Sequence, residues 1–131
     1  IRFRSLNGDG PKYLTRPGAN SHIYNIGALN SEGDTLVVCE GEMDTIIATQ
    51  AGFKAVGLPG ANTWKPFYSR VLADWSKVML LCDGDNAGRE MAKSIMQQLD
   101  NVLPVFMPEG QDVNDVYLSE GAEGLHKRIG V

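Results

Sequence analysis

The hydrophobic positions of this chain follow two alternating periods, one typical of buried strands and one typical of helices. Short apolar runs, several of them rich in β-branched residues, predict buried strands at residues 35–39, 54–58, 77–82 and 102–107. Between these runs, apolar residues that recur every three to four positions predict helices at 43–52, 65–75, 86–100 and from 112 toward the end of the chain. This alternation indicates an α/β fold, with a roughly four-stranded parallel sheet flanked by helices.

The first 30 residues follow a different pattern. Residues 1–6 and 11–15 alternate polar and apolar side chains on either side of the turn sequence NGDG, which predicts a β-hairpin. A loop and a short helical turn then lead into the first buried strand. We therefore expect two units: a hairpin with its connecting segment, residues 1–30, and one compact α/β domain, residues 31–131.

Two features of the pattern make sharper predictions. Pro104 lacks a backbone N–H, so the strand at 102–107 should lie at an edge of the sheet or carry a bulge. In the helix at 86–100, one stripe of apolar residues should face the core, and a polar face should lie opposite it. The members of that stripe are Ala87, Met91, Ile95 and Leu99.

The composition is that of an ordinary globular protein, with 43% hydrophobic and 21% charged residues among 131. No apolar stretch approaches the roughly 18 residues of a membrane span. Cys39 and Cys82 each lie at the end of an apolar run, and no Cys-x-x-Cys occurs. We expect two buried, reduced thiols in an intracellular protein. The chain begins at Ile1, which favours a fragment or a processed product.

The charge is distributed unevenly. Four of the 12 Lys and Arg residues, but only one of the 16 acidic residues, lie in residues 1–16, so this segment carries +3 and the remainder carries −7. The basic residues Arg2, Arg4 and Lys12 on the hairpin could therefore hold a polyanion. An ordinary solvated hairpin explains the same charges equally well.

Acidic residues follow three of the four predicted strands. Glu40 follows the first strand, Asp83 and Asp85 the third, and Asp112 the fourth, while Asp44 lies in the first turn of a helix. The carboxyl ends of parallel strands meet at one edge of a sheet, where ligands bind. We therefore expect the strands at 35–39 and 77–82 to be neighbours, with Cys39 and Cys82 near each other. Several carboxylates at one edge would repel one another unless divalent cations bind there. Oxygen ligands favour the hard cations Mg²⁺ or Mn²⁺ over zinc.

Such a site suits two-metal phosphoryl transfer, and three alternatives fit less well. An EF-hand loop beginning at Asp83 would need Asp or Asn at its fifth position and Glu at its twelfth, where the chain has Ala87 and Ser94. A phosphate-receiving signalling domain would need a lysine after the last strands, and the segment VFMPEGQD contains none. An aspartate-nucleophile phosphatase usually carries D-x-D after its first core strand, whereas here an earlier strand already carries Glu40. The chain has no P-loop, which excludes an ATPase motor of that kind.

The segments VVCEGEMDTIIATQAG, LLCDGDNAGRE and EGQDVND resemble the TOPRIM domain that is shared by primases, topoisomerases and some nucleases. The A-G-R after D-x-D resembles the primase branch, and PKYLTRPG resembles the stretch that precedes TOPRIM in bacterial primases. The segments EGEMD and QDVND are closest to phage primase-helicases. The resemblance covers residues 11 to about 117, and it implies a TOPRIM-type, Rossmann-like domain.

The resemblance also implies roles for individual side chains. Five acids would bind two Mg²⁺ or Mn²⁺ ions: Glu40, Asp44, Asp83, Asp85 and Asp112. Of these, Glu40, as acid or base, and the D-x-D pair would be catalytic. Lys12 matches a basic residue expected near template or nucleotide, and Arg89 could contact phosphate. Asn114 replaces the second Asp of the bacterial D-P-D, which weakens one metal contact or moves it to Asp115.

The implied function is the catalytic core of a DNA primase, which makes short RNA primers from NTPs on single-stranded DNA. A replicative helicase or a fused helicase domain would be a partner, no membrane would be involved, and the location would be the cytoplasm of a bacterial host cell. A TOPRIM nuclease, in which the same metals activate water, is the alternative. A degenerate TOPRIM domain that serves as an interaction module is a third reading, which the intact acids disfavour.

Overall fold

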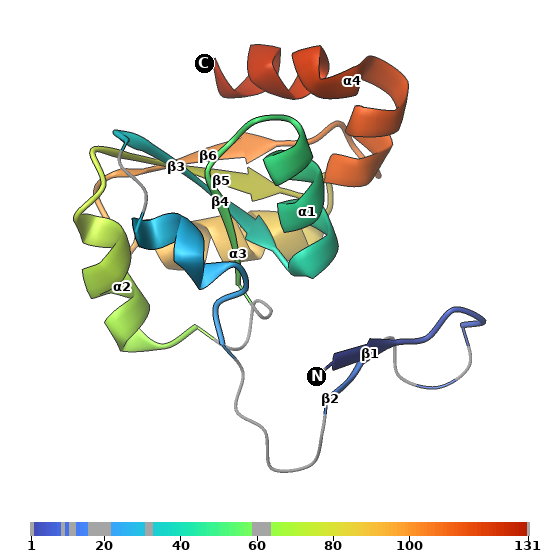
Figure 1. Ribbon diagram of the computed structural model, residues 1–131, viewed down its shortest axis with the longest axis horizontal. Helices are drawn as coiled ribbons and strands as arrows, with labels where there is room; N and C mark the ends of the chain where they lie inside the picture. Colours follow the sequence, from blue (N-terminus) through green and yellow to red (C-terminus); the bar gives the residue numbers. More distant parts are fainter. Residues whose placement is uncertain are drawn as a thin grey trace.

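The predicted alternation of strands and helices is present in the structure, a computed structural model that describes residues 2–8, 10, 13–15, 22–30, 33–58 and 64–130. Every predicted strand and helix is present (Figure 1), and three helices end two to four residues earlier than the sequence pattern predicts. The elements in chain order are β1 Arg2–Arg4, β2 Tyr13–Thr15, the 3₁₀ helix η1 Ile26–Asn30, β3 Thr35–Glu40, α1 Glu42–Gln50, β4 Ala55–Leu58, α2 Pro66–Ala73, β5 Lys77–Cys82, α3 Asn86–Met96, β6 Val102–Phe106 and α4 Val113–Ile129.

The main sheet has four parallel strands in the order β4-β3-β5-β6. The predicted neighbours β3 and β5 are adjacent, with Val38 opposite Leu80 in the register. The strand that contains Pro104 is at the edge, as the missing N–H requires. Because all four strands point the same way, the loops that follow them emerge at one edge of the sheet.

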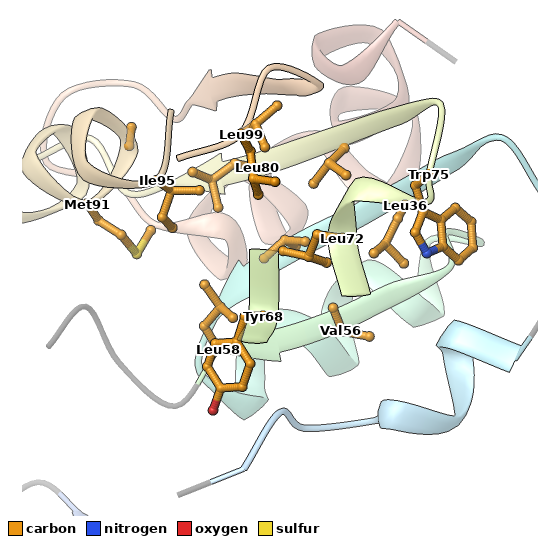
Figure 2. Close-up of a cluster of buried hydrophobic side chains, with 14 of the residues drawn as sticks. Leu36, Val56, Leu58, Tyr68, Leu72, Trp75, Leu80, Met91, Ile95 and Leu99 are labelled. Carbon is orange, nitrogen blue, oxygen red and sulfur yellow. The ribbon is translucent and has the colours of Figure 1, made fainter. Parts of the chain in front are cut away.

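Helices cover both faces of this sheet, and each face has its own core. On one face, α2 and α3 pack over side chains such as Leu36, Leu80 and Val56, which project from the same face of the sheet (Figure 2). On the other face, α1 and α4 pack over Val37 and Leu81. Successive residues of a strand point to opposite faces of the sheet. Because both faces of this sheet are apolar, its strands appear in the sequence as continuous hydrophobic runs.

The two cysteines lie on opposite faces of the sheet. Both thiols are buried and free, which confirms the prediction of two reduced cysteines. Cys39 belongs to the core under α1 and α4, whereas Cys82 belongs to the core under α2 and α3. They come from adjacent strands, so they are near each other as expected, but the sheet separates their side chains.

The inward face of α3 differs by one position from the prediction. Ala87 is exposed, and the buried residues of the helix are Gly88, Met91, Ala92 and Ile95. The cause is a close approach at the start of the helix, where a Cβ on Gly88 would collide with the carbonyl oxygen of Asp83. The backbone of Gly88 therefore faces inward and Ala87 faces outward. Leu99 is buried as predicted, although the helix ends before it.

The predicted hairpin is present as a separate two-stranded antiparallel sheet, in which Phe3 lies opposite Leu14. It lies apart from the four-stranded sheet (Figure 1). The structure describes only the backbone of Arg2 and Arg4, and Lys12 falls outside the described residues.

The segment that follows the hairpin is attached to the main sheet. Tyr24 forms a β-bridge with Gly57, through N–H···O distances of 2.8 and 3.0 Å. The side-chain amide of Asn25 donates to the carbonyl oxygen of Ala55 at 2.9 Å. These bonds satisfy backbone groups of β4, which is an edge strand. Among the described residues, no helix is long and apolar enough to cross a membrane.

Candidate metal-binding edge of the sheet

Glu40 and Asp44 are positioned by a sharp turn between β3 and α1. Glu40 is the last residue of β3, and Gly41 turns the chain with a φ of 82°, a value that side chains other than glycine rarely adopt. The N–H of Gly41 donates to the carbonyl oxygen of Leu58 at 2.8 Å, and the hydroxyl of the fully buried Thr45 donates to the carbonyl oxygen of Gly41 at 2.8 Å. The turn is thus fixed against β4, and it places both carboxylates at the carboxyl edge.

The loop after β5 is packed directly against the loop after β6. The N–H of Gly84 donates to the carbonyl oxygen of Gln111 at 2.9 Å, and the N–H of Gly110 donates to the carbonyl oxygen of Gly84 at 2.7 Å. A Cβ on Gly84 would overlap the carbonyl group of Pro108, so only glycine permits this approach. The contact brings the chain around Asp83 next to the chain that leads into Asp112.

Asp85 and Asp112 both cap helices. Oδ1 of Asp85 accepts a hydrogen bond from the N–H of Gly88 at 2.7 Å, at the start of α3. Oδ1 of Asp112 accepts from the N–H of Asp115 at 2.8 Å, while Oδ2 of Asp115 accepts from the N–H of Asp112 at 2.9 Å, which completes a capping box for α4. Each cap satisfies an N–H that would otherwise have no partner within its helix.

The two buried thiols show where the charges of the other acids converge. Burial raises the pKa of the Cys82 thiol to about 12, and the negative charges of Asp83 and Glu40 contribute to the increase. Burial also raises the pKa of the Cys39 thiol well above its ordinary value, with contributions from the charges of Asp44 and Asp83. The charge of Asp83 therefore contributes at both thiols, which is consistent with acids of β3, α1 and the loop after β5 lying near the same strand ends.

The donor chemistry of this edge fits a hard divalent cation, because all of its candidate ligands are carboxylate oxygens. Within the described part of the chain, however, no group of three or more Asp, Glu, His or Cys side chains lies close enough together to hold a metal ion. The site is therefore not a preformed cage. Mg²⁺ is suited to such a place, because it usually keeps several waters and uses one or two carboxylates together with phosphate oxygens.

Two other predicted residues lie beside these acids. Arg89 is in the first turns of α3, where its guanidinium donates to Glu109 at 3.1 Å and to Asn86 at 2.7 Å. Asn114 is half-buried in the first turn of α4. Asp115, the alternative ligand at this place, uses one carboxylate oxygen in the capping box.

Two features of the edge were missed in the sequence analysis. The pattern D-x-x-D before an apolar helix is a signal for a capping box, so the pairing of Asp112 with Asp115 was available from the sequence. The ion pair between Arg89 and Glu109 gave no such signal, because the two residues are 20 positions apart, one on α3 and the other in the loop after β6.

The chain matches the Toprim-like family over residues 37–117. It is 41% identical over 129 residues to the Gene 57 protein of Mycobacterium phage D29, covering 98% of this chain and 85% of that protein. It is 31% identical to the DNA primase of Pseudomonas aeruginosa, but it spans only 21% of that enzyme's length. The structure of the DnaG primase catalytic domain bound to ssDNA has a TM-score of 0.81 and 27% identity to it, over 98% of this chain and 46% of the other. The match to the family model covers more than half of the sequence and includes the acids of β3 and the loop after β5, so the chain belongs to the Toprim-like family.

Proposed function

We propose that this chain is the metal-binding catalytic core of a DNA primase, which synthesises short RNA primers from NTPs on single-stranded DNA. The observation that carries the proposal is the topology of the sheet: Glu40 ends β3 and Asp83 follows the neighbouring parallel strand β5, while Asp44 lies in the first turn of α1 directly after Glu40. The similarity to bacterial DNA primases, over 96% of this chain, supports primase over the other Toprim-like activities.

Five carboxylates are candidates to hold the metal, which we propose to be two Mg²⁺ or Mn²⁺ ions. Glu40 and Asp83 end or follow the central strands, Asp44 stands beside them, and Asp85 and Asp112 contribute from their capping positions. When bound, such ions neutralise phosphate charge and stabilise the attacking and leaving oxygens of the displacement. The protein's part is to fix these ligands on a rigid sheet edge. In this proposal, Glu40 accepts a proton from the attacking hydroxyl group.

The proposed partners follow from the same activity. A template strand and incoming NTPs carry phosphates, and bound cations would remove the repulsion between these phosphates and the carboxylate edge. Single-stranded DNA is bound by the DnaG catalytic domain that this chain resembles. We propose the same ligand here, together with a replicative helicase or fused helicase domain as a protein partner, and a location in the cytoplasm of a bacterial host cell.

Metal binding can be tested on the chain itself. Titration with Mn²⁺, followed by electron paramagnetic resonance, should show binding to the wild-type chain and a large loss of affinity in Asp83→Asn. Asp34→Asn is the matched control, because Asp34 is exposed at the opposite end of β3 and should bind Mn²⁺ as the wild type does. Equal affinity in all three proteins would show that the carboxyl edge does not bind the metal.

Activity is tested in a primase-competent protein that contains this domain, since the chain spans about a fifth of the bacterial primases it matches. Such a protein should convert labelled NTPs to short RNA on a single-stranded template, and Glu40→Gln should abolish synthesis. If the labelled template is instead cut in a metal-dependent reaction and no RNA is formed, the nuclease alternative holds and the primase proposal fails.

The hairpin is a second candidate contact for nucleic acid, through Arg2, Arg4 and Lys12, and we propose that it binds template or nucleotide phosphates. Binding of labelled single-stranded DNA should weaken steeply with salt, because it releases counterions. Replacing all three residues by Ala should lower the salt slope by about 0.7 for each phosphate contact removed. An unchanged affinity and slope would assign the template contacts to other parts of the protein.

A further inference from the structure

A groove runs between α3 and the edge strand β6, on the face of the sheet opposite α4. It is lined by side chains of both elements: Arg89, Ala92, Lys93, Met96, Gln97, Pro104 and Phe106. Phe106 and Met96 are each 44% exposed, so an aromatic ring and a thioether face solvent. The groove lies at the side of the sheet, because β6 is its last strand.

The end of this groove that is lined by Phe106 and Arg89 adjoins the candidate metal site. Phe106 lies opposite Cys82 in the register, and Cys82 directly precedes Asp83. On the other wall, the N–H of Arg89 donates to the carbonyl oxygen of Asp85 at 3.1 Å. The groove then follows α3 as far as Gln97, eight residues on, which is about 12 Å at the rise of an α-helix. That length accommodates roughly three stacked nucleotides at ~3.4 Å each.

The charge of the groove differs from that of its surroundings. Arg89 and Lys93 line it, whereas residues 17–131 carry eight basic and fifteen acidic residues. The ion pair between Arg89 and Glu109 is exposed on both sides, with 45% and 80% of the two side chains accessible. An exposed pair of this kind contributes little stability, so a phosphate group can replace Glu109 as the partner of the guanidinium.

We propose that this groove binds a single strand of nucleic acid as it passes the metal site, with Phe106 stacking on a base and with Arg89 and Lys93 contacting phosphates. Aromatic platforms combined with basic side chains are the usual means of binding single strands without sequence preference. The inference rests on the proposed function, because a strand must reach the carboxylate edge for phosphoryl transfer to occur there.

The experiment is titration of a labelled oligothymidine with the 131-residue chain, followed by fluorescence anisotropy at several salt concentrations with EDTA present. Phe106→Leu keeps the apolar floor but removes the ring, and it should weaken binding about fivefold or more. Phe106→Trp should restore or strengthen binding. The matched control is Phe67→Leu, since Phe67 is 48% exposed on α2, outside the groove, and should bind as the wild type does.

The charged residues provide two further measurements. Lys93→Gln should lower the salt slope by about 0.7. Glu109→Gln removes the competing carboxylate and should tighten binding roughly twofold or more. Glu123→Gln removes the same charge from α4, which covers the other face of the sheet, and should change affinity less.

Three outcomes would overturn the proposal for this groove. The wild-type chain could fail to bind oligothymidine at low salt, or Phe106→Leu and Lys93→Gln could both bind it with wild-type affinity. The third is that Phe67→Leu weakens the affinity as much as Phe106→Leu does. A groove that serves a protein helix would also leave DNA binding unchanged in every groove variant. Because EDTA removes the metal, these outcomes are independent of the Mn²⁺ titration, and the metal site can stand if the groove fails.

Discussion

Two pairs of acids at the carboxyl edge have the same chemistry and different structural tasks. Asp85 and Asp112 accept backbone hydrogen bonds at the starts of α3 and α4, so they stabilise the helices that they precede. Glu40 and Asp83 lie at the ends of the two central strands, and their charges act on the Cys82 thiol beneath them. Loss of function after substitution of a carboxylate at this edge can therefore have two causes: the helix is destabilised, or a metal-coordinating side chain is removed.

The largest effect on stability is expected at Gly84, because the loop contact at this residue holds one acid of each pair, Asp83 and Asp112. In Gly84→Ala, the new Cβ would overlap the carbonyl group of Pro108, and the loops that carry Asp83 and Asp112 would have to separate. We expect a loss of about 3 kcal/mol in the free energy of unfolding, measured by urea denaturation. Gly27→Ala is the control, since a Cβ there meets no atom within 4 Å. Equal stability of the two variants would mean that the loops are not held at this distance.

The next largest change in stability is expected from removal of a helix cap. Asp112→Ala deletes both an acceptor for the N–H of Asp115 and one side of the capping box, so it should lower the free energy of unfolding by about 1–2 kcal/mol. Asp112→Asn keeps an acceptor oxygen and should retain most of that stability while losing the charge. If Asn proves as destabilising as Ala in thermal or urea unfolding, the charge of Asp112 rather than its hydrogen bond stabilises α4.

The pH dependence of stability provides a probe beneath the other pair. The pKa of Cys82 rises from an ordinary 9.0 to about 12, because the folded state disfavours the thiolate. This contribution to stability is complete below pH 9 and is lost as the pH rises toward 12. At pH 10, the wild type should therefore have lost ~1 kcal/mol more than Cys82→Ala, each relative to its own stability at neutral pH. Parallel unfolding profiles for the two proteins would contradict the burial of this thiol under negative charge.

The smallest change in stability is expected at Asp83. Asp83→Asn removes one of the clustered negative charges without removing a helix cap, so in EDTA its unfolding free energy should stay within about 0.5 kcal/mol of the wild type or increase. The wild type should gain thermal stability when Mg²⁺ is added, and the variant should not. A large destabilisation of the metal-free variant would place Asp83 with the capping acids.

The sequence predicted most of the fold because the core residues are consecutive. Leu36, Val37 and Val38 are buried on alternate faces of the sheet. In a chain with an α/β pattern, such a continuous apolar run indicates a strand that is buried on both faces. Pro104 correctly placed its strand at the edge. The phase of α3 was wrong because Gly88 packs against the Asp83 carbonyl, a close approach that periodicity does not report.

The candidate site was predictable in its members more than in its geometry. The positions of Glu40, Asp83 and Asp112 after strands followed from parallel topology. The capping role of Asp85 depends on the N–H of Gly88, and the partner of Arg89 comes from a different loop. Such contacts form only after the sheet has set the loops side by side, so local sequence patterns give little information about them.

The β-bridge of Tyr24 has a consequence for dissecting this protein. The family match begins at residue 37, and the proposed division of the chain falls between residues 30 and 31, which makes either position a natural place to cut. A fragment cut there would lose the bonds that Tyr24 and Asn25 make to β4, and the open strand would become a template for other chains to pair with. A truncated domain should therefore begin no later than residue 22, so that this short segment keeps the sheet from aggregating.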